Sequence, residues 1–223
     1  MSLLPTYIHI VKPKLKHIYL SFNDEGHLVV KSPKISLARI EKLLLQKASW
    51  INASRKKLAQ KKGKALTFTQ DSQLYFLGES HPLELIAYDK KRTKLLFDGD
   101  TFRLYYSQYD VNVFQKHIDT FYKNEAQAYI PTIVQQWAET MQLTPSKISF
   151  RKTKRQWGSC SSKNALSFNT MTMKLPLDVI KYIIIHELAH IQHKHHQKAF
   201  WALVEQYLPT YKQCIQELKN YTT

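Results

Sequence analysis

The most constraining feature of the sequence is the pentapeptide His186-Glu187-Leu188-Ala189-His190. Residues four apart lie on one face of an α-helix, so the two histidines point the same way, one turn apart. The glutamate lies about 100° further around the helix, where its carboxylate can reach a water on a metal without binding the metal itself. The pattern H-E-x-x-H thus places two zinc ligands and a general base on one turn of helix.

The sequence around this pattern predicts a buried helix. Three isoleucines, 183–185, precede it, and Leu188, Ala189 and Ile191 make the helix apolar nearly all round. Buried histidine and glutamate side chains must be paired or must coordinate a metal. A pair of core histidines with ordinary hydrogen-bond partners is the alternative interpretation.

A catalytic zinc usually has three protein ligands and one position left for water. His196 lies six residues after His190, far enough for the chain to turn and return an imidazole. We expect His196 to be the third ligand, one zinc ion per chain, and Glu205 to be its rival. His193 and His195 are expected to be solvated. Zinc is preferred over other divalent metals on ligand type alone.

The chain is strongly basic, with 33 Lys+Arg against 17 Asp+Glu, a formal charge of +16. This excess favours an anionic partner such as a nucleotide or nucleic acid, although an inert solvated surface has the same composition. A hydrophobic content of 43% is typical of a globular chain.

The number of cysteines and the search for targeting signals bear on the cellular compartment. Cys160 and Cys214 are the two cysteines, too few for a disulfide framework, and we expect both to be reduced. The sequence contains neither a signal-peptide pattern nor an apolar run of about 20 residues. We therefore expect a cytoplasmic protein with no membrane partner.

Alternation and helical periodicity predict an α+β fold with two domains. Residues 1–108 read as a β-rich N-terminal region with one helix over 37–58, and a hairpin joins 15–22 to 27–31 through a turn at 23–26. Residues 109–223 read as a helical catalytic domain of zincin type with a small strand edge. Its first helix spans 110–141, where Pro131 is expected to kink or split it.

A second segment is expected beside the helix that carries His186 and His190. Strands are predicted over 148–154 and 166–174, pairing across the turn at 161–164. Between them lie Trp157, Gly158 and Ser159, well placed to align an extended peptide by backbone hydrogen bonds. Arg151 and Arg155 are further candidates for substrate binding. Cys160 is expected to be a small buried filler, with direct catalysis by Ser159 or Cys160 as the weaker hypothesis.

The segment 151–201 resembles the YgjP-like metallopeptidase-domain family. Trp157-Gly158-Ser159-Cys160, Pro176 before the helix, and HELAH followed by His196 and Phe200-Trp201 carry this resemblance. The zinc helix is also similar to those of SprT-like and WLM-type peptidases. The resemblance implies that His186, His190 and His196 are the ligands and that Glu187 is the base. Gln197 departs from the family pattern, in which serine is expected.

These features together predict a zinc-dependent hydrolase, and a metallopeptidase acting on a peptide or protein is the leading interpretation. Two other interpretations stay open. The same site could hydrolyse a nucleotide or another phosphate compound, or the chain could be a basic nucleic-acid-associated protein in which zinc is structural.

Overall fold

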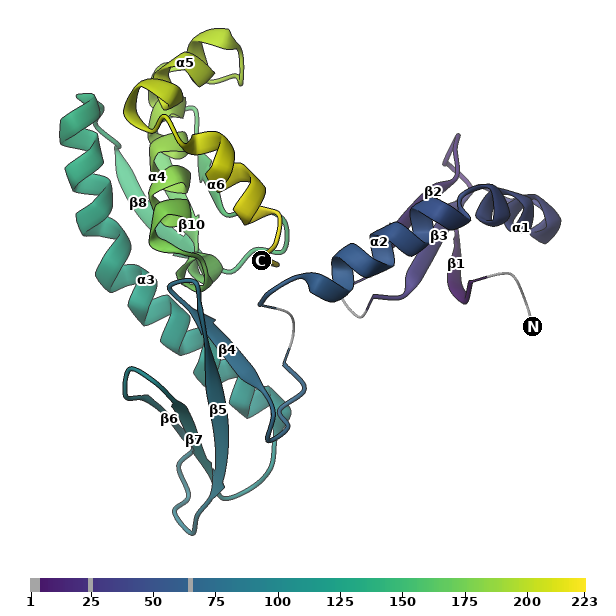
Figure 1. Ribbon diagram of the computed structural model, residues 1–223, viewed down its shortest axis with the longest axis horizontal. Helices are drawn as coiled ribbons and strands as arrows, with labels where there is room; N and C mark the ends of the chain where they lie inside the picture. Colours follow the sequence, from purple (N-terminus) through teal and green to yellow (C-terminus); the bar gives the residue numbers. More distant parts are fainter. Residues whose placement is uncertain (1–4, 24–25, 64–65) are drawn as a thin grey trace. The chain divides into compact units, whose positions relative to one another are not determined.

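The computed structural model describes residues 5–23, 26–63 and 66–223. The chain forms two compact units, residues 1–61 and 62–223 (Figure 1). The described residues form six α-helices and three small sheets, with most strands in the N-terminal half, so the predicted α+β class is confirmed. The predicted boundary between residues 108 and 109 lies inside the second unit. The predicted boundary stays a prediction.

The first unit contains a three-stranded sheet. Strand β3 (Leu28–Ser32) lies between β1 (Tyr7–Val11) and β2 (Tyr19–Phe22). β2 and β3 are antiparallel, as in the predicted hairpin, and β1 runs parallel to β3. Asp24 and Glu25 of the predicted turn lie outside the described residues.

The single helix predicted over 37–58 is two helices, α1 (Leu37–Gln46) and α2 (Ala48–Gln60). They meet at Lys47, whose φ of −99° and ψ of 8° interrupt the helical geometry. The apolar period continues across this bend, which is why the sequence pattern indicates one helix. The residues that share the small core of this unit are Leu28, Val30, Ile40, Leu44 and Ile51.

The second unit begins with a four-stranded sheet. Its strands, in spatial order, are β4 (Gln73–Phe76), β5 (Glu79–Ala87), β7 (Phe102–Tyr106) and β6 (Lys94–Phe97). Aromatic side chains of this sheet contact Phe121 on the following helix, so the sheet is anchored to the helical part of the unit.

Helix α3 (Val111–Met141) begins at Asp110, whose side chain accepts hydrogen bonds from the N–H groups of Asn112 and Val113. A capping carboxylate of this kind satisfies donors that the first helical turn leaves free. Pro131, which the sequence predicts to kink or split the helix, lies within one continuous helix. Its buried face recurs at helical spacing through residues 114, 118, 122, 126, 130 and 134.

A second small sheet lies beside the metal-motif helix. Strand β10 (Ala165–Asn169) is central, parallel to β8 (Lys147–Arg151) and antiparallel to β9 (Gly158–Cys160). The strand that pairs with β10 across the turn at 161–164 is therefore β9. The predicted strand over 166–174 ends at Asn169, because the side chain of Asn169 accepts a bond from Met171 N and the chain enters a 3₁₀ helix, Thr170–Lys174.

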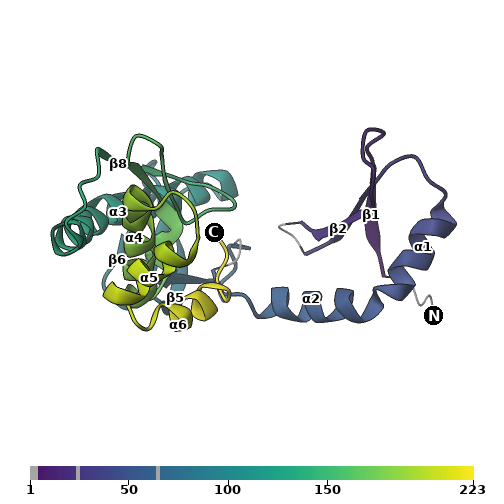
Figure 2. The same cartoon turned by 90° about the horizontal axis from the view of Figure 1, so that it is seen from above.

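Helix α4 (Leu177–Gln192) carries the pentapeptide and is buried along most of its length. It packs against α3, α5 (Lys198–Tyr207) and α6 (Tyr211–Leu218), as Figures 1 and 2 show. It also packs against the edge strand β9. No helix among the described residues is both long and apolar enough to cross a membrane. Both cysteines are free thiols.

Candidate metal centre

Three imidazoles meet at the C-terminal end of α4. The Nε2 atom of His196 lies 3.0 Å from Nε2 of His186 and 3.1 Å from Nε2 of His190. His186 and His190 come from successive turns of α4, and His196 returns from the loop between α4 and α5. One ligand atom from each histidine lies within 4.8 Å of the others, a spacing that a single ion can bridge.

The first turn of α5 holds these rings in place. The buried ring of Phe200 packs against all three imidazoles, with centroid distances of 4.9 Å to His186, 4.6 Å to His190 and 4.8 Å to His196. Trp201 stacks on His196 at 5.7 Å and on Tyr211 at 5.4 Å. The imidazoles are thus oriented by packing.

Hydrogen bonds at the far side of the rings determine which nitrogen faces the centre. His190 Nδ1 lies 3.0 Å from the carbonyl oxygen of His193, and a carbonyl only accepts, so Nδ1 carries the proton and Nε2 keeps its lone pair. His186 Nδ1 lies 3.3 Å from the Tyr182 hydroxyl. Burial lowers the pKa of His186 to about 3 and lowers the pKa of His190 as well. Neutral imidazole is the form that binds metals.

The donor set fits a zinc ion. Tetrahedral ligands held about 2.05 Å from zinc lie roughly 3.3 Å from one another. The two Nε2–Nε2 separations of 3.0 and 3.1 Å are close to that value. Nε2 of His196 faces Nε2 of His186 and Nε2 of His190 but carries at most one proton. It can therefore donate a hydrogen bond to only one of them, so hydrogen bonds alone do not satisfy all three nitrogens. Three histidines would hold the ion and would leave a fourth coordination position for water.

Glu187 supplies a carboxylate next to this group. The residue is 5% exposed, and Oε2 is the one buried side-chain polar atom without a hydrogen-bond partner among the described residues. Burial raises the pKa of this carboxyl to about 8. A buried polar oxygen without a partner indicates that something else, such as a water molecule, completes the site.

Strand β9 passes directly over Glu187. A Cβ atom added at Gly158 would lie 2.7 Å from both Cγ and Oε1 of Glu187, closer than real Cβ atoms approach. Trp157 is half-buried against the main core, and Ser159 Oγ accepts a hydrogen bond of 3.1 Å from the guanidinium of Arg151. The structure thus brings Gly158 to the site and places Ser159 and Arg151 on the adjacent sheet.

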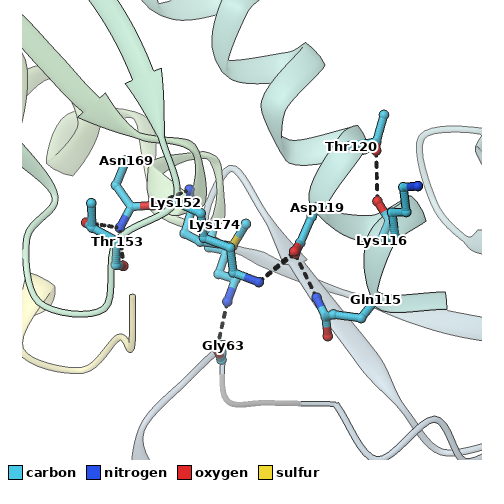
Figure 3. Close-up of polar contacts among 10 residues, drawn as sticks. Gly63, Gln115, Lys116, Asp119, Thr120, Lys152, Thr153, Asn169 and Lys174 are labelled. Carbon is cyan, nitrogen blue, oxygen red and sulfur yellow. Dashed lines mark hydrogen bonds and ion pairs between the residues drawn. The ribbon is translucent and has the colours of Figure 1, made fainter. Parts of the chain in front are cut away.

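The loop before β9 is fixed by Asn169, which sequence reasoning missed. Its Nδ2 donates to the carbonyl oxygens of Thr153 and Gln156 at 2.8 and 2.9 Å, and its backbone N–H donates to the carbonyl oxygen of Trp157 at 2.8 Å. Lys152 in the same loop binds the carboxylate of Asp119 on α3 at 2.7 Å (Figure 3). Both contacts join residues that are far apart in the sequence, so no local sequence pattern predicts them.

Lys194 is a second residue that sequence reasoning missed. It lies in the loop that delivers His196, and its Nζ donates to Asn164 Oδ1 at 2.6 Å and to the carbonyl oxygen of Ser161 at 3.2 Å. Both acceptors belong to the turn that follows β9. A lysine inside a histidine-rich loop is the only hint that the sequence offers.

Three of the residues weighed in the sequence lie elsewhere. Glu205, the rival third ligand, is outside the histidine group, and its carboxylate pairs with Lys212 at 3.3 Å. The side chain of His195 is exposed, and Arg155 is exposed without a side-chain hydrogen bond or ion pair to any described residue. His193 contributes its backbone carbonyl to His190, as described above.

The family is shown by a comparison with protein-family models. The model of the YgjP-like metallopeptidase domain matches residues 16–221. The chain belongs to the YgjP-like metallopeptidase family. The resemblance found over residues 151–201 is therefore confirmed and extends over nearly the whole chain. A comparison with curated proteins gave no match.

Two solved structures are similar to part of this YgjP-like chain. The metallopeptidase zymogen abylysin of Pyrococcus abyssi is 19% identical with a TM-score of 0.37, covering 42% of this chain and 99% of that one. The metallopeptidase zymogen jannalysin of Methanocaldococcus jannaschii is 25% identical with a TM-score of 0.35, covering 40% of this chain and 96% of that one.

Proposed function

We propose that this YgjP-like chain is a zinc-dependent peptidase in which His186, His190 and His196 hold the metal and Glu187 is the general base. The observation that carries the proposal is the convergence of three imidazole Nε2 atoms beside the helical turn of Glu187, whose buried Oε2 has no hydrogen-bond partner among the described residues. Family membership supports peptide hydrolysis as the reaction.

The chemistry divides between the metal and the chain. Zinc held by three histidines supplies a Lewis acid, which makes water more acidic and polarises a carbonyl oxygen. Glu187 Oε2 accepts the proton of the attacking water and then delivers it to the amine that leaves. Gly158 has no side chain, so the backbone of β9 can lie directly against this carboxylate and keep it in place.

The substrate would bind as an extended chain along β9. The order β8-β10-β9 leaves one edge of β9 without a strand partner among the described residues. Backbone groups on such an edge can pair with a peptide and align its scissile bond. We therefore assign substrate binding to the segment Trp157–Ser159, with Arg151 beside it. Residues 109–223 would carry the chemistry, and the protein would act in the cytoplasm.

Hydrolysis of a nucleotide or another phosphate compound is the second candidate. Residues 147–200 contain ten lysines and arginines against two carboxylic acids, which favours an anionic substrate. The same metal and base could activate water towards phosphorus. Binding of nucleic acid with a structural zinc stays a third hypothesis, which the salt dependence of binding would test.

The test is a side-by-side assay of the zinc-loaded protein. Wild type and Glu187→Gln are incubated with unfolded protein substrates and, separately, with nucleoside triphosphates. We expect wild type to cleave the protein substrates, and we expect Glu187→Gln to retain one zinc but lose at least a hundredfold in turnover. Unchanged turnover in Glu187→Gln would refute the assigned base. Release of phosphate without proteolysis would replace the peptidase by the second candidate.

A further inference from the structure

Arg151 is an exposed residue at the end of β8, on the face of the small sheet that points away from the core of Leu166 and Phe168. Arg151 pairs in register with Asn169, and Ser167 pairs with Ser159. Alternate residues of a strand share a face, so these side chains lie on one face of the sheet. Leu166 and Phe168 on the other face are fully buried. The Arg151 guanidinium therefore crosses β10 to reach Ser159 Oγ at 3.1 Å.

This guanidinium has unused hydrogen-bonding capacity. An arginine offers five N–H donors in a planar fork that matches a carboxylate. Arg103, in the other sheet of this unit, is bound by the carboxylates of both Glu84 and Asp98. Arg151, by contrast, has no carboxylate partner among the described residues, and its one described contact is to a neutral hydroxyl.

The carboxylates described near this sheet are engaged elsewhere: Asp119 on α3 is paired with Lys152 at 2.7 Å. The two carboxylic acids within residues 147–200 are Asp178 and Glu187. Asp178 lies in the first turn of α4 and is paired with Lys181 at 3.1 Å, and Glu187 is buried under Gly158 on the opposite face of the sheet. Arg151 is therefore the charged group that lies at Ser159 on this face of the sheet.

We propose that Arg151 is a specificity-determining residue that binds a carboxylate of the peptide substrate. This inference rests on the proposed peptidase function. A strand added to β9 would lie about 4.8 Å beyond Ser159, and every second side chain of it would share the face of Ser159 and Arg151. A carboxylate on that side chain can take up the free donors of the guanidinium in a charge-assisted pair. The carboxylate can come from aspartate, from glutamate or from the C-terminus of the peptide.

The experiment uses the full-length, zinc-loaded protein and a peptide library made by digesting a whole proteome. Mass spectrometry identifies the cleaved bonds. We expect aspartate and glutamate to be enriched at one fixed position relative to the cleaved bond, or cleavage to occur at one fixed distance from the C-terminus. One cleaved peptide is then synthesised with Glu→Gln at that position and, separately, with an amidated C-terminus. The form that loses cleavage identifies the source of the carboxylate.

Variants assign the preference to the residue. We expect Arg151→Gln to lower kcat/KM for the acidic peptide by about tenfold to a hundredfold and to leave the Gln peptide unaffected. Arg151→Glu should reverse the preference towards lysine at the same position. Lys147→Gln is the matched control, because Lys147 is an exposed cation on the same strand and face. It should keep the acidic preference.

The outcomes separate the two proposals. Cleavage with no acidic preference, or a preference that survives Arg151→Gln, overturns the role of Arg151 and leaves the peptidase function standing. An equal loss of kcat/KM for the acidic peptide and for the Gln peptide in Arg151→Gln would show that Arg151 only supports Ser159. That result also overturns this inference. Absence of cleavage of every peptide by wild type overturns both proposals.

Discussion

Gly158 and Glu187 lie in direct contact, although they are 29 positions apart in the sequence: a Cβ atom at position 158 would lie 2.7 Å from both Cγ and Oε1 of the glutamate. The glycine is not needed here for an unusual backbone conformation, because its φ is not positive. It is needed because the strand that would bind the substrate passes over the carboxylate that would act as base. The WGSC segment and the HELAH helix are therefore in direct contact at Glu187.

Replacing Gly158 by alanine should separate catalysis from metal binding. The added methyl group must displace either the Glu187 carboxylate or strand β9, and a misplacement of about 1 Å can cost a hundredfold in rate. We expect a fall in peptide turnover of about that size with one zinc retained, measured on zinc-loaded protein. Ser167→Ala on the adjacent strand is the control and should retain turnover. Full activity in Gly158→Ala would show that the contact has no role in catalysis.

Lys194 should act as a positioning residue for the third histidine. Its bonds to Asn164 and Ser161 tie the loop that carries His196 to the turn after β9. Lys194→Met should weaken zinc binding about tenfold, as loss of a contact that orients metal ligands commonly does. Competition with a chelator measures this change.

Two further variants show whether the effect at Lys194 is specific. Lys194→Arg retains a cationic donor and should recover most of the affinity, whereas Lys198→Met removes a nearby exposed lysine and should have no effect. An equal zinc affinity in wild type and Lys194→Met would show that the loop holds His196 without this residue.

Asn169 should contribute strongly to stability. It is 2% exposed, and its side chain bonds to Thr153, Gln156 and Met171. Asn169→Ala leaves these backbone groups unsatisfied in a buried place, so we expect a loss of about 2–4 kcal/mol in the free energy of unfolding. Denaturant unfolding measures it. Thr140→Ala on the exposed face of α3 should change stability by less than about 0.5 kcal/mol, and an equally small effect at Asn169 would contradict the assigned role.

Helix α4, which carries the H-E-x-x-H pattern, could be predicted most directly from the sequence, because a helical period and a fixed spacing are both local properties. The placement of Glu187 beside two histidines follows from one turn of helix. The approach of His196 rested on loop length and on family resemblance, and the packing of Phe200 against all three rings now gives it a physical basis.

Features that depend on distant contacts could not be predicted. The parallel pairing of β8 with β10 has no turn to mark it, and β10 ends where Asn169 bonds to its own downstream backbone. Lys47 interrupts a helix without a proline or glycine, within an apolar period that continues unbroken. Lys194 and Asn169 were missed because their partners lie in other elements.

The most direct test of the central claim is the metal content of wild type, His196→Ala and Glu205→Ala, each purified without added metal. The three-histidine site predicts about one zinc in wild type and in Glu205→Ala, and its loss in His196→Ala. Loss of zinc in Glu205→Ala with retention in His196→Ala would contradict the site and make the carboxylate the third ligand. No metal in any of the three proteins, and none taken up from added zinc, would contradict the metal centre itself.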